Sequence, residues 1–346
     1  TFKNQYLFSR EYSPLYASFF AAVGGWLEEY PPHPVGAWLL EASHDRRPLD
    51  VSILLAAALH RDILLEVPQL SALAQYYPSV GGTLPAGRAV GKDWSIDQEF
   101  KRSLNRSIMV RRDHLKAFIQ TSQVQTNETG RGISWLLPLS LAGWSRVHLF
   151  DLGASAGLNL VAEKRSYQLI ETQREGGYFR LGKGKAAQFE VRSSAIPDFP
   201  PAASIKGPQI LSRLGCDIKP FFLRTPLDEV TLAAFVWADQ IARMARLQEG
   251  IAAYRQVEKS YAPVELHAVE LPAGLPDFLE QHMREGSEPL ICYNTFIRMY
   301  LPQKGFALRS HLSEWARKQD RPVVWIQWEP PSSLNDPHGE APEYGW

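Results

Sequence analysis

One short segment, residues 147–160, restricts the fold more than any other part of the sequence. It begins as an apolar run, reaches Asp151, and continues into the glycine-rich letters GASAG. A buried strand that ends in a glycine loop and leads into a helix is typical of a parallel α/β sheet. We therefore expect an α/β fold with a nucleotide-cofactor site at this loop.

The remaining sequence divides into a helical part and a strand–helix part. Apolar residues recur at helical spacing through the first 140 residues; Ser13 and Pro14 are typical of a helix start, and Ser95 with Gln98 predicts a capping box. Further strands are expected at 210–214, 264–269, 290–293 and 323–328, with helices at 232–254, 276–283 and 306–318 between them. This order predicts a mainly parallel sheet.

These patterns give a provisional domain organisation. Residues 1–140 are expected to be a helical amino-terminal region that covers the cofactor cleft. Residues 141–346 are expected to form a Rossmann-like cofactor-binding domain. Alternating segments around the glycine pair at 176 predict an inserted hairpin near 165–192.

Composition excludes several classes of function. The 37 basic and 37 acidic residues cancel, so no overall field attracts nucleic acid or an anionic membrane. The two cysteines, Cys216 and Cys292, lack companions at metal-ligand spacing. The sequence shows no secretion signal and no apolar run of the ~18 residues that span a bilayer. We expect a cytoplasmic protein that acts on a small molecule; its oligomeric state is left open.

The glycine loop fits the pattern acidic-x-Gly-x-small-x-Gly found after the first strand of S-adenosylmethionine-dependent methyltransferases. Residues without side chains let the backbone approach a cofactor, and the carboxylate can accept bonds from the methionine ammonium group. Serine replaces the usual middle glycine. The residues assigned to cofactor binding here are Asp151, Gly153, Ser155, Gly157 and Asn159.

The same letters also spell Gly-x-Ser-x-Gly, the nucleophile pattern of α/β-hydrolases. Ser155 would then attack an acyl carbon, with His311 or His338 as its base. A hydrolase needs several strands before this loop, whereas the preceding 140 residues are helical in pattern, so methyl transfer is favoured. The order of glycines disfavours NAD and FAD. A third alternative is a protein of this fold that binds a ligand without catalysis.

An acidic residue at the end of the second strand would hold the ribose hydroxyls of the cofactor. Asp217 is the candidate, and removing the inserted hairpin brings its spacing close to that expected. It could equally be a surface aspartate in a turn after Gly215.

Several segments together resemble one bacterial family, domain of unknown function 2332. The matching segments are SPLYASFF at 13, RRPLDVSILLAAALH at 46, LAQYYPSVGG at 73, VQTNETGR at 124, LFDLGASAGLNL at 149, FVWADQIARMARLQ at 235 and PVVWIQWEP at 322. The resemblance implies a helical amino-terminal region joined to a methyltransferase-like Rossmann domain, and no established reaction. The chain departs from the family pattern after Val264, which leaves Glu270 as a rival to Asp217 for the cofactor contact.

Two further groups are assigned to the acceptor. A polar cluster before the first strand is expected in the substrate pocket, although it could instead cap a helix at Ile133; its members are Gln125, Asn127, Glu128 and Arg131. Tyr293 and Asn294 stand where the family pattern has His and Ser, and are expected to be catalytic groups that orient the acceptor. Asn294 could instead satisfy local backbone. The sequence thus predicts methyl transfer from S-adenosylmethionine to a small or medium-sized acceptor.

Overall fold

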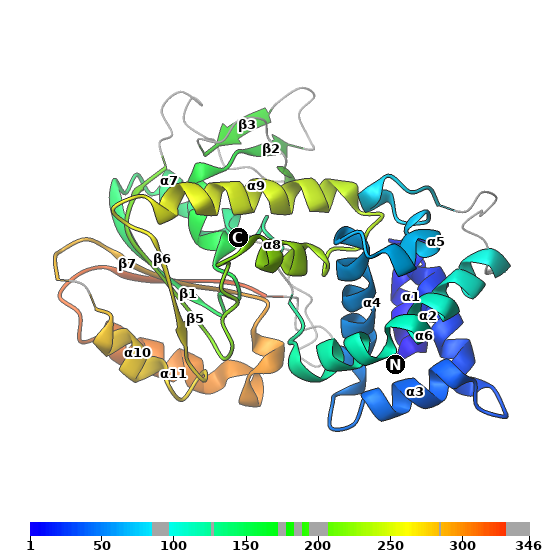
Figure 1. Cartoon of the computed structure of the whole chain (residues 1–346). Helices are drawn as coiled ribbons and strands as arrows, with labels where there is room; N and C mark the ends of the chain where they lie inside the picture. The colour runs from blue at the N-terminus through cyan, green and yellow to red at the C-terminus, as the bar shows by residue number, and fades with distance from the viewer. Residues whose placement is uncertain are drawn as a thin grey trace. The chain divides into compact units, whose positions relative to one another are not determined.

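The computed structural model describes residues 1–84, 97–125, 128–171, 178–182, 189–193, 207–283 and 285–329 (Figure 1). The chain forms two compact units. A helical unit comprises Thr1–Thr126 and Leu223–Leu247, and a sheet unit comprises Asn127–Phe222 and Gln248–Trp346. The units therefore alternate along the sequence, and they are not split at residue 140. Whether the helical unit covers the cofactor site stays a prediction.

The helical unit is built from helices that begin at residues suited to that position. Its members are α1 (Phe2–Ser9), α2 (Pro14–Glu28), α3 (Pro34–Ala42), α4 (Pro48–Leu64), α5 (Ser71–Ala74), α6 (Gln98–Thr121), α8 (Pro226–Ala233) and two 3₁₀ turns, η1 (Pro68–Leu70) and η2 (Pro78–Val80). Ser13 caps α2 as expected, because its hydroxyl accepts from Tyr16 N–H. The capping box expected for α6 is wrong, since Asp97 is the cap and accepts from Phe100 N–H at 2.9 Å.

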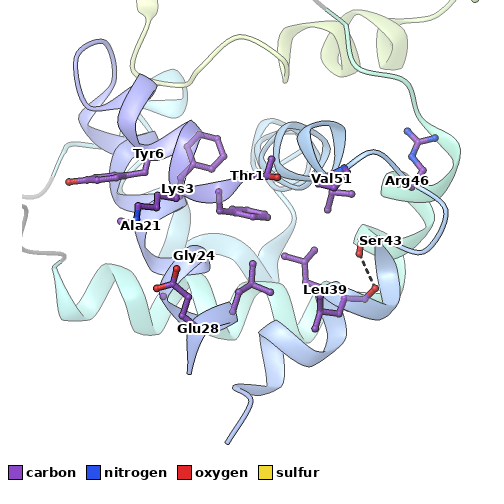
Figure 2. Close-up of a pocket in the computed structure, with 16 residues that line it drawn as sticks. Thr1, Lys3, Tyr6, Ala21, Gly24, Glu28, Leu39, Ser43, Arg46 and Val51 are labelled. Carbon is purple, nitrogen blue, oxygen red and sulfur yellow. Dashed lines mark hydrogen bonds between the residues drawn. The ribbon is translucent and has the colours of Figure 1, made fainter. Parts of the chain in front are cut away.

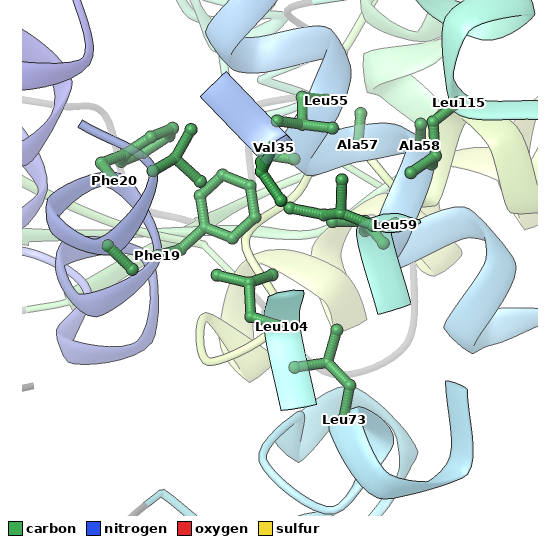
Figure 3. Packing of buried hydrophobic residues seen from close by; sticks show 14 of the residues in the cluster. Phe19, Phe20, Val35, Leu55, Ala57, Ala58, Leu59, Leu73, Leu104 and Leu115 are labelled. Atoms are coloured by element: carbon green, nitrogen blue, oxygen red, sulfur yellow. The ribbon is translucent and has the colours of Figure 1, made fainter. Parts of the chain in front are cut away.

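Large apolar side chains from most of these helices meet in one core (Figure 3). Phe19, Leu59 and Leu104 are 0–1% exposed within it. The helix expected over 232–254 is interrupted between α8 and α9 (Ile241–Glu258). In this interruption, Trp237 stacks on Tyr16 with ring centroids 5.3 Å apart, and tertiary packing of this kind can outweigh local helix propensity.

The sheet unit contains a five-stranded sheet in the order β6-β5-β1-β7-β8. The strands are β1 (Arg146–Leu152), β5 (Gln209–Asp217), β6 (Val264–Ala268), β7 (Leu290–Thr295) and β8 (Val323–Trp328), and every neighbouring pair is parallel. This confirms a mixed α/β fold with a parallel sheet. Asp151 pairs with Gly215 on one side and Tyr293 on the other, so the carboxyl ends of the three central strands meet at one edge.

Helices cover both faces of this sheet. On one face, Leu149 and Ile291 pack with residues of α7 (Ile133–Leu141). On the other, Phe150 and Cys292 pack with α10 (Leu275–Gln281) and α11 (Phe306–Ala316), which lie side by side in Figure 1. Successive residues of β1 thus enter opposite cores, as strand geometry requires.

A second, small sheet occupies the segment where the sequence predicts a hairpin. Its strand order is β3 (Tyr178–Leu181), β2 (Tyr167–Glu171), β4 (Phe189–Ser193). β2 pairs antiparallel with β3 and parallel with β4. Among all the helices that the structure describes, none is both long enough and apolar enough to span a membrane.

Candidate functional site

The loop after β1 has a backbone that favours glycine. Gly153, Ser155 and Gly157 have φ angles of +90°, +50° and +72°. Serine adopts this left-handed region at a cost, which explains why glycine is usual at the middle position. The N–H groups of Gly153 and Ala154 both donate to Cys216 O, at 2.8 and 2.9 Å, which holds the loop on β5.

Close packing also requires glycine at 153. A Cβ there would lie 2.2 Å from Ile297 Cγ2, far inside van der Waals contact. Ile297 follows β7, so the turn after β7 packs directly on the glycine loop. The space where a Gly153 side chain would lie is therefore occupied by Ile297. A ligand would have to approach the loop from another direction.

Asp151 is a buried carboxyl group at the end of β1. It is 3% exposed, and Tyr293 Oη–H donates to its Oδ2 at 2.8 Å. Burial raises the pKa of Asp151 to about 7; the Tyr293 hydrogen bond lowers it and the charge of Asp217 raises it further. A carboxyl group of this kind becomes ionised when a cation binds beside it.

Asp217 lies at the end of β5 and joins the same loop. Its Oδ2 accepts from Ser155 N–H at 2.9 Å and its Oδ1 from Lys219 N–H at 3.1 Å. The structure thus brings together the loop and the acidic residue expected to close the second strand. Its rival Glu270 is exposed just after β6, and its carbonyl accepts from Gly274 N–H.

Asn159 connects the loop to α7. Its Oδ1 accepts from Gly132 N–H at 2.9 Å, and its carbonyl accepts from Trp135 Nε1–H at 2.8 Å. It belongs to a 3₁₀ segment, η3 (Leu158–Lys164), which stands where the sequence predicts the start of a helix. Its Oδ1 and its carbonyl oxygen therefore contact protein, and the expected cofactor contact of Asn159 stays a prediction.

Tyr293 and Asn294, expected to orient the acceptor, are both 0% exposed. Asn294 Nδ2–H donates to Glu329 Oε1 at 2.6 Å, and Asn294 Oδ1 accepts from Trp325 Nε1–H at 2.7 Å. Both side chains therefore contact protein. Glu329 is a member of the site that the sequence reasoning did not single out, although it ends the family segment PVVWIQWEP.

The structure describes three members of the expected substrate-pocket cluster, and their shared pocket stays a prediction. The Arg131 guanidinium lies over the Phe296 ring, with Cζ 4.0 Å from the ring centroid, which places it beside the turn after β7. Glu128 Oε1 accepts from Gly130 N–H at 3.4 Å. Gln125 is buried in the helical unit, and Asn127 lies outside the described residues.

The hydrolase alternative needs a histidine near Ser155. His311 Nδ1 lies 3.0 Å from Pro272 O, so that ring nitrogen is bound to the loop between β6 and α10. His338 lies outside the described residues. No strand precedes β1 in the part of the chain that the structure describes.

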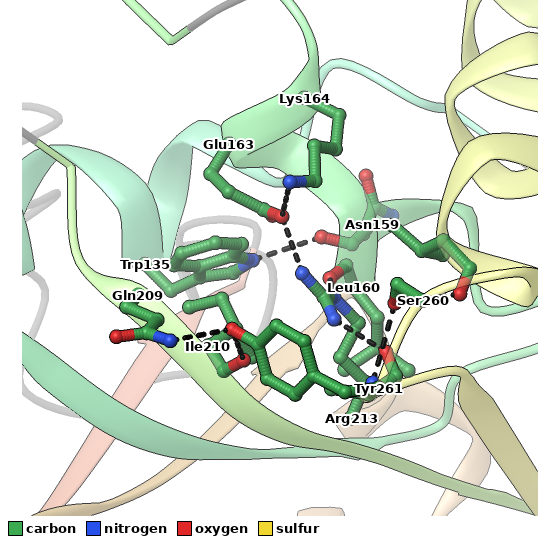
Figure 4. Close-up of polar contacts among 12 residues, drawn as sticks. Trp135, Asn159, Leu160, Glu163, Lys164, Gln209, Ile210, Arg213, Ser260 and Tyr261 are labelled. Atoms are coloured by element: carbon green, nitrogen blue, oxygen red, sulfur yellow. Dashed lines mark hydrogen bonds and ion pairs between the residues drawn. The ribbon is translucent and has the colours of Figure 1, made fainter.

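Two cavities are lined by residues outside the glycine loop. One, of about 560 Å³, is an open pocket lined by residues of α1 to α4 of the helical unit, and its walls are mainly apolar with charged side chains such as Glu28 and Arg46 at its rim (Figure 2). The other, of about 570 Å³, lies beside the first residues of β1 and β5. Arg213 lines it and is held by Glu163, by Leu160 O at 3.0 Å and by Ala262 O at 2.5 Å (Figure 4).

Comparison with known proteins identifies a family. The model of a family described as "Uncharacterized protein conserved in bacteria (DUF2332)" matches residues 3–343. No curated protein and no solved structure matches the chain. In the described residues, no three His, Cys, Asp or Glu side chains are grouped so that they could hold a metal ion.

Proposed function

The chain belongs to this bacterial family, and we propose that it is an S-adenosylmethionine-dependent methyltransferase with a methyltransferase-like Rossmann domain. Its acceptor would be a small or medium-sized molecule. The observation that carries the proposal is the position of the acidic residue and glycine loop in the sheet. They follow β1, which is the first of these five strands along the chain and the central one in the order β6-β5-β1-β7-β8, at the point where the strand order reverses. Open α/β sheets bind ligands at such a point, beyond the carboxyl ends of their strands.

The charges at this edge suit the cofactor. The buried Asp151 carboxyl group would face the methionine ammonium, and a bound cation would favour its ionised form. Asp217 accepts one backbone N–H on each oxygen, which leaves further lone pairs for ribose hydroxyls. We therefore prefer Asp217 to Glu270 for the ribose.

The bound cofactor would supply an electrophilic methyl group, so the protein has mainly to position the acceptor and exclude water. The contacts of Tyr293 and Asn294 support positioning roles. Tyr293 orients Asp151, and Asn294 is hydrogen-bonded to Glu329. Arg131, beside the turn after β7, is the member of the polar cluster best placed for an acceptor contact.

The experiment is a thermal-shift assay with S-adenosylmethionine and S-adenosylhomocysteine at millimolar concentration. Both should raise the melting temperature, because they bind the folded state selectively. Asp151→Ala should abolish the increase. No stabilisation of the wild-type chain by either compound would contradict the proposal.

One observation favours serine hydrolysis as a second candidate. Ser155 combines the Gly-x-Ser-x-Gly pattern with a positive φ, as in a nucleophile turn. The substitution Ser155→Gly separates the candidates, because glycine suits the backbone but removes the nucleophile. A methyltransferase should keep its cofactor-induced stabilisation in this variant. Labelling of the wild-type chain by a fluorophosphonate probe, lost in Ser155→Gly, would instead establish the hydrolase.

A further inference from the structure

The turn after β7 is held in an uncommon conformation. Phe296 has φ +57°, a region that aromatic residues seldom adopt. Its N–H donates to Trp328 O at 3.0 Å, which ties the turn to β8. Such backbone conformations persist only where the surrounding contacts enforce them.

The Glu329 carboxylate accepts several of the hydrogen bonds that hold this turn. Glu329 Oε1 accepts from Asn294 Nδ2–H at 2.6 Å and from Ile297 N–H at 3.1 Å, while its Oε2 accepts from Arg298 N–H at 3.2 Å. Hydrogen bonds to a charged acceptor are stronger than neutral ones. Glu329 therefore fixes two consecutive backbone amides and the strand-end side chain before them.

The Asn294 amide cannot rotate to accommodate a different partner. Its Oδ1 accepts from Trp325 Nε1–H at 2.7 Å, so its Nδ2–H₂ must face position 329. Three donors thus converge on that position. A glutamine there would place its own N–H₂ against at least one of them, whereas glutamate satisfies all three.

The turn has further contacts. Ile297 Cγ2 occupies the space where a Cβ of Gly153 would be, and the Arg131 guanidinium lies on the Phe296 ring. The position of Ile297 on the glycine loop consequently depends on how firmly Glu329 holds the amides of residues 297 and 298.

We infer that Glu329 is a positioning residue that fixes the turn at 296–298 and, through Ile297, the shape of the glycine loop that binds the cofactor. The inference rests on the proposed function for its effect on cofactor affinity. Its effect on the turn itself does not depend on that function.

The experiment compares Glu329→Gln with the wild-type chain, using calorimetry with S-adenosylhomocysteine and hydrogen exchange of the peptide containing residues 297 and 298. We expect about tenfold weaker binding and about tenfold faster exchange, from the loss of a charge-assisted network. Glu314→Gln, which neutralises an exposed carboxylate on α11, is the matched control and should change neither. Trp325→Phe frees the Asn294 amide and should shift both measurements in the same direction by a smaller factor.

The two measurements separate the possible failures. If Glu329 only stabilised the fold, Glu329→Gln would have a lower melting temperature but the same dissociation constant and the same exchange rate as the wild-type chain. That result would overturn the inference. If the wild-type chain binds no S-adenosylhomocysteine, the proposed function fails, and the exchange comparison still decides whether Glu329 fixes the turn. Should Glu329→Gln not fold, Trp325→Phe provides the same comparison.

Discussion

At the scale of single residues, the glycine loop illustrates what sequence reasoning can reach. The pattern of Asp151, Gly153 and Gly157 was sufficient to locate the loop, because strand, turn and small residues are local features. The partner that makes Gly153 necessary, Ile297, lies 144 residues later (297 − 153) in a turn with no local signature. Glu329 likewise has no local signature, since its three donors come from another strand and the turn after that strand.

The Gly153–Ile297 contact can be tested by a double-mutant cycle. Gly153→Ala should destabilise the fold by about 2 kcal/mol or more, because the new methyl group overlaps Ile297 and φ is +90°. Ile297→Ala, at an 8% exposed position, should cost about 2–3 kcal/mol. In the double variant, the loss of unfolding free energy should be smaller than the sum of the two single losses by about 1 kcal/mol, as measured by urea denaturation. Additive losses would show that the two residues do not share this space.

The raised pKa of Asp151 predicts how stability depends on pH. Burial, opposed by the Tyr293 hydrogen bond and reinforced by Asp217, raises the folded-state pKa to about 7 from 3.8. The protonated carboxyl group makes its full contribution to the free energy of unfolding below about pH 4. This contribution falls by about 1.4 kcal/mol per pH unit as the pH rises to about 7. Asp151→Asn should therefore be more stable than wild type at pH 8, by on the order of 2–4 kcal/mol, and lose this advantage near pH 4. The same difference in unfolding free energy between the two chains at both pH values, measured by denaturation, would contradict this prediction.

At the scale of elements, several strands and helices lie close to where the sequence predicts them, whereas one expected helix is interrupted. The expected strand at 323–328 has the observed bounds, and that at 290–293 is two residues short at its carboxyl end. Apolar runs between turn residues carry this information locally. The break between α8 and α9 has no local signal of this kind, and the Trp237 side chain within it packs on Tyr16, a contact between distant segments.

The role of Asp97 as the cap at the start of α6 can also be tested. Asp97→Ala removes the acceptor for Phe100 N–H and should cost about 1 kcal/mol of unfolding free energy. Asp113→Ala, which alters a 95% exposed side chain on the same helix, is the control and should change stability by less than about 0.5 kcal/mol. Equal effects of the two substitutions would show that Asp97 is not the cap.

At the scale of the whole molecule, the sequence predicted one boundary and the structure has an interleaved arrangement. The segment Leu223–Leu247 returns to the helical unit between two strands of the sheet. Ala238 within it is fully buried in the helical core. No linker composition marks this passage, so the two-part division at residue 140 was the simplest prediction available from local patterns.

This arrangement predicts the outcome of truncation. A fragment of residues 141–346 would lack all of α7 except its last residue, and would retain Ala238 without the helical core in which it is buried. It should show no cooperative thermal transition by circular dichroism, whereas the full chain should. A fragment that unfolds cooperatively would mean that the sheet unit is independent of the helical one.

The central claim is that the glycine loop of β1 binds the methyl donor, and calorimetric titration of the full chain with S-adenosylhomocysteine tests it most directly. Asp151→Asn is the matched control, because it should be at least as stable as wild type at pH 8 yet lack the carboxylate for the ammonium group. We predict saturable binding at one site per chain, and at least tenfold weaker binding to the Asn variant. Absence of binding to the wild-type chain, or equal affinity of the two chains, would contradict the account.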